Sequence, residues 1–404
     1  MGELNSGTHA VKVLSPYSFS IGDTSGYADY TAGGVVCQLH RPKTLDFKSL
    51  SQQLVDPALL VVDFVKCESP GQTLLGYRAL SAFQAAHSGA SPRPWNAADA
   101  AEMLQLAKAA NDTAVPAAKV KDVDEEILKL FSYTCSGCMA PLCATIGGWA
   151  AQEALKGLTG KFGPLVQMLF VDAVEVAPPL DTGAAMCQPR GDRYDHLRVC
   201  IGDTVCTKLA DSKLFMVGCG AIGCEMLKNY ALLGVGTSEN GKITITDNDL
   251  IEKSNLNRQF LFRPRHIQSS KAAVGAESAK AINKDLKIEA HQFKVGPDTA
   301  RTVYTDTFFE GVDIVVNALD NLQARLFMDA CAVRNQRPLL ESGTMGAKGH
   351  VQVIIPHLSE SYASQRDPPE ADVPYCTLKS FPSTIEHTIQ WVSTFGLEKL
   401  DDRA

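Results

Sequence analysis

Residues Leu214–Gly223 read LFMVGCGAIG, an apolar run followed by three glycines at GxGxxG spacing. The apolar run is typical of a buried strand, and the residues after the glycines have the periodicity of a helix. Glycines in such a turn let backbone N–H groups approach a phosphate at the positive end of the helix. Gly218, Gly220 and Gly223 therefore predict a phosphate-binding loop, although a tight turn without a ligand would have the same pattern.

The sequence around this loop alternates between strand-like and helix-like segments. Such alternation predicts a mostly parallel sheet covered by helices, which is a Rossmann-like α/β fold. The expected strands are residues 214–217, 243–246, 288–295 and 314–319, with a further strand-like run at 351–356, and the expected helices are residues 222–233, 271–283 and 323–333.

The other segments predict a chain of several domains. Residues 1–70 alternate short apolar runs with turn residues, as a small β-rich module does. Residues 71–130 have helical periodicity and predict a helical bundle, in which Asn96 and Asp99 are placed to cap a helix. Residues 131–178 contain an apolar helix that Gly160 should end and a strand-like run at 165–171. After a boundary rich in proline and polar residues, the α/β domain occupies residues 190–356, and residues 357–404 begin another domain.

Carboxylates at the end of the second α/β strand indicate where a ribose would bind. Asp247 follows the glycines by about the 20 residues that the dinucleotide-binding pattern requires, and Asp249 is close enough to act instead. The same pattern also suits an NAD-dependent oxidoreductase, but that hypothesis rests only on the glycine loop and Asp247.

The residues that follow favour a triphosphate over a nicotinamide. Asn257, Arg258 and Gln259 come next, and Arg263 and Lys271 add further positive charge. Arginine grips phosphate oxygens in pairs and lysine acts as a point charge, and both stabilise the negative charge of a leaving group. Solvated surface charge remains the alternative for Arg258 and Arg263.

Asp320 and Asn321 end another buried strand, at the carboxyl edge of the sheet where open α/β folds bind ligands. Mg²⁺ prefers oxygen ligands and usually shares few protein carboxylates with substrate phosphates. Asp320 is therefore our candidate ligand for Mg²⁺.

Two groups of cysteines require separate consideration. Cys376 lies in a proline-rich loop near Lys379, where a thiol could be partly ionised and nucleophilic, although an isolated cysteine is more often inert. His387 is a weaker candidate for its base. Cys135 and Cys138 have zinc-knuckle spacing, but no second pair follows at a usable distance, so we do not expect zinc there.

Composition excludes several classes of protein. With 404 residues, 45% of them hydrophobic and 21% charged, the chain resembles soluble globular proteins. A formal net charge of -7 lacks the excess of Lys and Arg with which proteins coat DNA, so we expect no nucleic acid partner. No apolar run approaches the ~20 residues that cross a bilayer, so we expect no membrane. Twelve cysteines and no signal segment indicate a reducing compartment, the cytoplasm with or without the nucleus.

Several stretches together resemble the ubiquitin-activating enzymes, members of the wider ThiF-type family that adenylates the C-terminus of ubiquitin-like proteins. The likeness begins near Ser20 and covers most of the chain. The stretches are VGCGAIGCE at 217–225, IEKSNLNRQFLFR at 251–263, ALDN at 318–321, LLESGTMGAKG at 339–349, DPPE at 367–370 and CTLKSFPSTIEHTIQW at 376–391.

This resemblance implies an enzyme that uses ATP and Mg²⁺, activates ubiquitin or a ubiquitin-like modifier, and passes it to a ubiquitin-conjugating enzyme. The family's cysteine at the position of Cys376 forms a thioester with ubiquitin. Family residues that bind ATP correspond to Ala221, Asp247, Arg258, Lys271, Asp320 and Asn321.

The resemblance also assigns a role to each segment. It implies that residues 1–70 are the first catalytic-cysteine half-domain and 71–130 the helical-bundle insert. Residues 131–178 would end an inactive adenylation domain, 190–356 would form the active one, and 357–404 would begin the second catalytic-cysteine domain. Family members have a long N-terminal region and continue well beyond the cysteine, whereas the likeness here stops at Trp391. We therefore expect a truncated chain, whose alternative function is to bind ATP or ubiquitin without catalysis.

Overall fold

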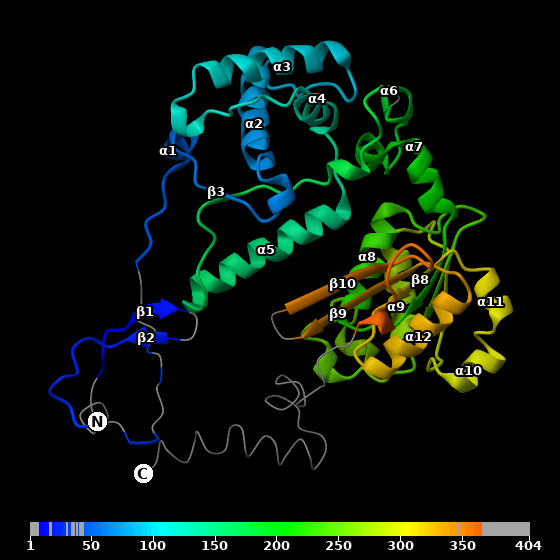
Figure 1. Ribbon diagram of the computed structural model, residues 1–404. Helices are drawn as coiled ribbons and strands as arrows, with labels where there is room; N and C mark the ends of the chain where they lie inside the picture. The colour runs from blue at the N-terminus through cyan, green and yellow to red at the C-terminus, as the bar shows by residue number, and fades with distance from the viewer. Residues whose placement is uncertain are drawn as a thin grey trace. The chain divides into compact units, whose positions relative to one another are not determined.

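The computed structural model describes residues 8–15, 18–29, 31–33, 37, 39, 44–181, 183–345 and 348–365 (Figure 1). Contacts between residues divide the chain into two compact units, 1–47 and 48–404. In the first unit, β1 (Lys12–Ser15) and β2 (Ser18–Ser20) form an antiparallel hairpin in which Val13 lies opposite Phe19. The domain bounds expected from the sequence stay predictions.

The second unit begins with helices that pack around an apolar core. They are α2 (Ser69–Ala86), α3 (Ala97–Asp112) and α4 (Glu125–Thr134), and they follow the short helix α1 (Leu50–Val55), which contributes no residue to that core. Phe83 and Met103 are buried in the core that α2, α3 and α4 share. Asn96 caps α3 as predicted, because its side chain accepts a hydrogen bond from the backbone N–H of Asp99 at 3.0 Å. The Asp99 carboxylate does not cap the helix but binds the Arg93 guanidinium at 2.6 Å.

The next helix has an apolar composition and no buried residue within the described structure. It is α5 (Ala140–Thr159), and Gly160 ends it in the left-handed conformation, with φ 64°, as the sequence predicted. Leu158 on this helix is 83% exposed. The strand expected at 165–171 is confirmed only over β4 (Met168–Leu169), which pairs in parallel with β3 (Leu59–Leu60).

The main sheet lies in the C-terminal half of the second unit. In the described residues it has six strands in the order β10-β9-β8-β5-β6-β7. The strands are β5 (Lys213–Val217), β6 (Lys242–Thr246), β7 (Ile288–His291), β8 (Ile314–Asn317), β9 (Leu339–Met345) and β10 (Lys348–Ile354). All neighbours are parallel except β10 and β9. The predicted mostly parallel sheet is confirmed, but β7 is shorter than expected and β9 was not predicted.

Helices cover both faces of this sheet, and β5 contributes to both cores. The helices are α8 (Ala221–Leu233), α9 (Lys271–Ile282), α10 (Pro297–Thr302), α11 (Asp306–Glu310) and α12 (Leu322–Arg334). Met216 packs with Leu227 of α8 on one face, whereas Phe215 packs with Phe309 and Met328 of α11 and α12 on the other. Successive strand residues point to opposite faces, so a strand buried on both faces has a continuous apolar sequence.

The helical part and the α/β part of the second unit are joined at a buried tryptophan. Trp95, which is 4% exposed, donates a hydrogen bond from Nε1 to the carbonyl of Val199 at 2.9 Å. Its ring stacks on Tyr133 with centroids 4.8 Å apart, and Gly183 leaves room for it, since a Cβ there would lie 2.0 Å from the indole. Val199 belongs to α7 (Asp195–Asp211), which follows the short α6 (Gly183–Met186).

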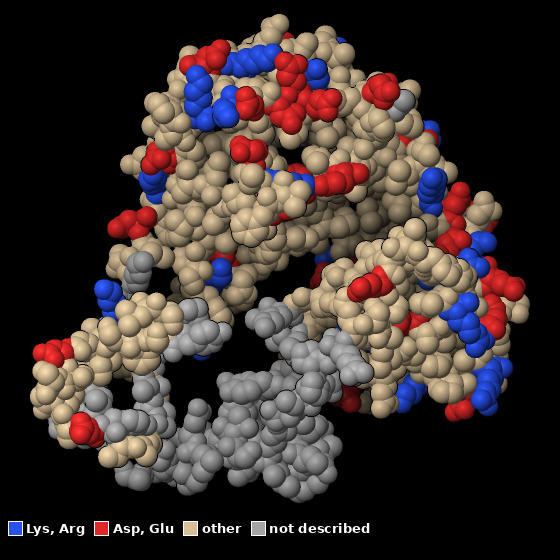
Figure 2. Space-filling model, viewed as in Figure 1, with Lys and Arg blue, Asp and Glu red and all other residues tan. Residues whose placement is uncertain are grey.

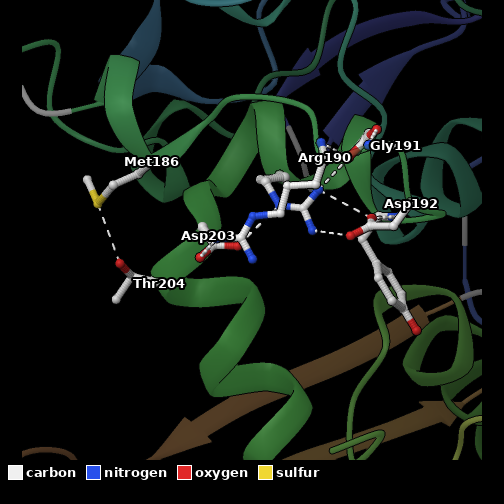
Figure 3. A network of polar contacts seen from close by, with 9 residues as sticks. Met186, Arg190, Gly191, Asp192, Asp203 and Thr204 are labelled. Carbon is white, nitrogen blue, oxygen red and sulfur yellow. Dashed lines mark hydrogen bonds and ion pairs between the residues drawn. The ribbon is translucent and has the colours of Figure 1, made fainter.

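Polar contacts that include Arg190, Asp192 and Asp203 surround the first turns of α7 (Figure 3). The buried Arg198 joins this network. The Arg198 side chain is 4% exposed and binds Asp192 at 2.6 Å, Asp195 at 2.5 Å and Asp203 at 3.2 Å. Arg190, which is 60% exposed, binds the same Asp203 carboxylate at 2.5 Å. Burial disfavours the charge on Arg198, but the hydrogen bonds to Asp192 and Asp203 outweigh it, so the pKa of Arg198 is raised. The network fixes the turn that leads into α7.

On the face shown in Figure 2, basic and acidic side chains lie next to one another over the helical part and over the α/β part. Proteins that coat nucleic acids instead present a stripe of one sign. Among the described helices, none is both long enough and apolar enough to span a bilayer.

Candidate active site

The turn from β5 into α8 has no space for a side chain at two of the three motif glycines, Gly218 in the loop and Gly223 in the first turn of α8. Gly218 has φ 99°, in the left-handed region, and a Cβ there would lie 2.4 Å from the carbonyl oxygen of Ala318. A Cβ on Gly223 would lie 2.4 Å from the carbonyl oxygen of Gly218. The loop is therefore fixed tightly against the end of β8 and against the first turn of α8.

The amino end of α8 is the part of the loop that can accept a ligand. The helix begins at Ala221, and its N-cap residue Gly220 has no side chain to bind the first N–H groups. Around Gly220 the structure is open, since the nearest atom to a Cβ would be Nε2 of Gln259 at 3.9 Å. Gln259 is buried, and its Oε1 has no hydrogen-bond partner among the described residues. In the described structure, the N–H groups at this helix end can donate to a phosphate, and the unpaired Gln259 acceptor suits a hydroxyl or amino donor of the same ligand.

Asp247, Asp249 and Lys271, three of the predicted site residues, lie together beside this loop. The two carboxylate oxygens of Asp247 accept the backbone N–H of Cys219 at 2.7 Å and that of Asp249 at 2.8 Å. The Nζ atom of Lys271 binds the Asp249 carboxylate at 2.7 Å, and the Lys271 residue is buried. Burial raises the pKa of Asp247, although the two N–H bonds and Lys271 act against it. A hydrogen-bonded chain thus connects the glycine loop to a buried cation.

The loop that carries Asn257 and Arg258 follows the short helix η5 (Lys253–Asn255). Arg258 is exposed, and its guanidinium contacts the Ser254 carbonyl at 3.0 Å and Oδ1 of Asn257 at 3.2 Å. In the described part of the chain, no carboxylate pairs with Arg258, so its charge is available to an anion. Arg263 turns to its own loop and donates to the Phe262 carbonyl at 2.8 Å.

Asp320 and Asn321 follow β8 in the loop before α12, because β8 ends at Asn317 rather than at the expected residue 319. Asp320 is exposed. Asn321 is the N-cap of α12, and its side chain accepts the N–H of Ala324 at 2.8 Å, so its carboxamide oxygen already has a structural role. Among the described residues, no group of three or more His, Cys, Asp or Glu is placed to hold a metal. Asp320 alone fits Mg²⁺ only where substrate phosphates supply other ligands, and this is the usual Mg²⁺ arrangement.

A buried polar cluster next to this edge was not predicted. Asn317 at the end of β8 donates to Glu341 of β9 at 2.6 Å, and Ser342 donates to the Asn317 carbonyl at 2.8 Å. Arg325 of α12 lies 3.4 Å from the same Glu341 carboxylate. The available signal was a polar residue inside each apolar run, VVN at 315–317 and LLE at 339–341.

Some of the predicted residues do not join the site within the described structure. Cys376 and His387 lie outside the described residues, so the thioester prediction stays a prediction. Cys138 lies 3.5 Å from Cys143, sulfur to sulfur, rather than in a set of three or more metal ligands among the described residues.

A hollow of about 640 Å³ lies at the opposite edge of the sheet, at the amino ends of β5 and β6. Lys213, Gly241 and Lys242 are in its lining, whereas the predicted site residues are not. The candidate site is therefore an open edge of the sheet rather than this cavity. Open α/β sheets bind ligands at the carboxyl ends of their strands.

Comparison with known proteins identifies the family. Residues 194–395 match the model of the ThiF family. This chain belongs to the ThiF family. Residues 41–111 match the ubiquitin-activating enzyme E1 four-helix bundle, and residues 1–40 match the ubiquitin-activating enzyme E1 FCCH domain. The predicted ThiF-type α/β fold and the resemblance to ubiquitin-activating enzymes are confirmed.

Curated relatives agree with these matches. Ubiquitin-like modifier-activating enzyme 6 of Homo sapiens is 51% identical over 97% of this ThiF chain and 37% of its own length. Ubiquitin-like modifier-activating enzyme 1 of Homo sapiens is 49% identical over 94% of this chain and 36% of its own length. Ubiquitin-activating enzyme E1 1 of Candida albicans is 45% identical over 98% of this chain and 39% of its own length. The chain thus spans well under half the length of these relatives.

Proposed function

We propose that this chain takes part in the ATP-dependent activation of ubiquitin or a ubiquitin-like protein. In the first step, an oxygen of the modifier's C-terminal carboxylate attacks the α-phosphorus of ATP. The bond from that phosphorus to the β-phosphate bridge oxygen breaks, pyrophosphate leaves, and an acyl adenylate forms. Because the displacement occurs at an anionic centre, its main requirement is fixed positive charge.

The observation that carries this proposal is the hydrogen-bonded chain from the glycine loop through Asp247 and Asp249 to Lys271. It supports binding of the phosphates at the amino end of α8, with the charge of Lys271 held close by. Asp247 and Asp249 are suited to accept the ribose hydroxyls. The names of the relatives, which are modifier-activating enzymes, support the activation of a modifier.

Arg258 and Asp320 complete the proposed set. Arg258 has a guanidinium without a carboxylate partner in the described structure, which suits it to bind a phosphate and to stabilise charge on the leaving group. Asp320 would hold Mg²⁺, which supplies charge neutralisation on the phosphates when bound. Asn257, Gln259 and Asn321 border the same edge as polar partners for the nucleotide.

We propose a second step at Cys376. Its thiolate would attack the acyl carbonyl, the bond to AMP would break, and the modifier would be held as a thioester. The modifier would then pass to a ubiquitin-conjugating enzyme, in the cytoplasm with or without the nucleus. This step rests on the resemblance of residues 376–391 to the family sequence.

Pyrophosphate exchange tests the first step with the full chain, ATP, Mg²⁺ and ubiquitin. We expect Lys271→Met to lower the exchange rate by about 10²-fold, as loss of one charge-stabilising donor does. Lys280→Met is the matched control, because Lys280 lies on the same helix but is exposed and borders the opposite edge. Equal rates for wild type and Lys271→Met would refute the assignment.

A non-reducing gel tests the second step. We expect a ubiquitin adduct that thiol reductant removes and Cys376→Ala abolishes. ATP binding without exchange would instead support the alternative function, a non-catalytic binder of ATP or ubiquitin. The relatives' greater length is the observation that keeps this alternative open.

A further inference from the structure

The loop that carries Asp320 is held at its backbone by a side chain that follows it. Arg325, in the first turns of α12, points back and donates two hydrogen bonds to the Leu319 carbonyl, from Nε at 3.2 Å and from Nη2 at 2.7 Å. On the other side, the Ala318 N–H donates to the Val217 carbonyl at 2.8 Å. Asp320 is the next residue after these two anchors.

Arg325 is itself held from β9. Glu341 is fully buried, and its Oε1 lies 3.4 Å from the Arg325 Nε, while its Oε2 accepts the Asn317 amide at 2.6 Å. Gly343 leaves the space that the guanidinium occupies, since a Cβ there would lie 2.2 Å from Nη2. The strand ends of β8 and β9 thus fix the direction of the Arg325 side chain.

This cluster is poorly arranged for stability alone. Burial raises the pKa of the Glu341 carboxyl, and the Asn317 hydrogen bond and the Arg325 charge offset only part of that increase. Oδ1 of Asn317 and Oε1 of Glu341 have no hydrogen-bond partner among the described residues. A buried ion pair with unsatisfied acceptors is often no more stable than apolar side chains of similar volume. A role in positioning accounts for such a cluster better than a role in packing.

The loop also lies directly against the candidate nucleotide site. A Cβ on Gly218 would lie 2.4 Å from the Ala318 carbonyl oxygen, so the glycine loop and the Asp320 loop are in close contact. A small movement of this carbonyl would therefore change the separation between the glycine loop and the Asp320 carboxylate.

We propose that Arg325, braced by Glu341, is a positioning residue that holds Asp320 in place for a magnesium-bound nucleotide. This inference rests on the proposed function for its ligand. Arg325 touches the loop backbone, and Asp320 makes the contact with the ligand. Glu341 acts one step further away, through Arg325.

The test uses the full chain and two measurements. Amide hydrogen exchange reports how firmly residues 318–322 are held, and ATP titrations at a series of Mg²⁺ concentrations report the Mg²⁺ needed for half-maximal binding. We expect Arg325→Met to speed exchange in 318–322 and to raise that Mg²⁺ concentration about tenfold or more, as loss of a residue that orients a metal ligand does. Arg325→Lys should recover part of both losses, since it keeps the charge but not the paired donors.

Arg334→Met is the matched control, because Arg334 lies on the same helix and pairs with Asp306 at the surface. It should leave both measurements unchanged. Glu341→Gln removes the charge behind Arg325 with little change of shape and provides the same test if Arg325→Met fails to fold. Unchanged exchange and an unchanged Mg²⁺ requirement in folded variants would overturn the proposal. A wild-type chain that binds no ATP would refute the proposed function, whereas the exchange rates in 318–322 would still decide whether Arg325 holds the loop.

Discussion

Replacing Arg198 with methionine should destabilise the chain strongly at neutral pH. Methionine fills the space of the arginine stem without a cavity but donates no hydrogen bond. The change leaves Asp192, Asp195 and Asp203 facing one another without the shared cation. Removing one partner of a buried ion pair costs about 3–5 kcal/mol, and we expect the lower end, because the three carboxylates are partly exposed and can be rehydrated.

The loss of stability on replacing Arg198 should depend on pH in a defined direction. The pKa of Asp192 lies below its ordinary value of 3.8, chiefly because the Arg198 side chain donates a hydrogen bond to it. The pKa of Asp195 is also below 3.8, chiefly because the backbone N–H of Arg190 donates to it, and the charge of Arg198 adds to this effect. Carboxylates with a lowered pKa stabilise the fold above their unfolded pKa, and this stabilisation is lost as pH falls through the folded pKa. The gap in unfolding free energy between wild type and Arg198→Met should therefore be full at pH 5–8 and narrow below about pH 4.

Urea denaturation followed by circular dichroism measures this gap, with Arg190→Met as the control. Among the described residues, the exposed Arg190 side chain pairs only with Asp203, so its replacement should change the unfolding free energy by less than about 1 kcal/mol. The reasoning is wrong if Arg198→Met unfolds within about 0.5 kcal/mol of wild type at pH 7, the usual range for surface changes. It is also wrong if the gap keeps its full size at pH 3.

Three further predictions concern the glycine loop, the junction between helices and sheet, and the ribose carboxylate. Gly218→Ala should lower the free energy of unfolding by about 1–3 kcal/mol and weaken ATP binding, because alanine would be strained at φ 99° and would meet the Ala318 carbonyl. Thermal shift with and without ATP measures both effects, and an unchanged melting temperature would contradict this prediction. Trp95→Phe should cost about 1–2 kcal/mol in urea unfolding, since it leaves the Val199 carbonyl without its donor; a loss no larger than that of an exposed tryptophan change would count against it. Because burial raises the pKa of Asp247 above 3.8, the affinity of the wild-type chain for ATP should fall as pH drops from 7 towards 4, whereas Asp247→Asn should bind ATP weakly at every pH. Isothermal titrations of both chains measure this, and an equal dependence of affinity on pH in the two would reject the role of the carboxylate.

The sequence predicted the α/β fold well where strands are buried on both faces. The run at 214–217 is continuous and apolar, whereas 243–246 alternates isoleucine with threonine and is buried on both faces all the same. The helices that follow these two strands begin after Gly220 and Ser270. The prediction failed at β9, because LLESGTM places Glu341 and Ser342 where a strand pattern requires apolar residues. Those two side chains are buried through contacts with Asn317, which lies 24 residues from Glu341 in the chain. Such a pairing cannot be recognised from local periodicity.

The candidate site was predictable to the same degree. Asp247 and Asp249 follow β6 at the carboxyl edge of the sheet, where open α/β folds bind ligands, and Lys271 begins α9 at the other end of the same connection. Asn321 shows the limit, because its side chain caps α12, and capping and ligand binding favour the same residue types. Arg325 was missed since a positively charged residue early in a helix has no distinct signal until its carbonyl acceptor is known.

The hydrogen bond from Trp95 to Val199 also gives the molecule an optical reporter. A buried indole emits at shorter wavelength than an exposed one, and Trp95 is buried at the junction between the helices and α7. Trp149 on α5 is 36% exposed, and Trp391 lies outside the described residues. In a chain with phenylalanine at positions 149 and 391, emission would come from Trp95 alone. Separation of the two parts during unfolding could then be timed independently of the loss of helix.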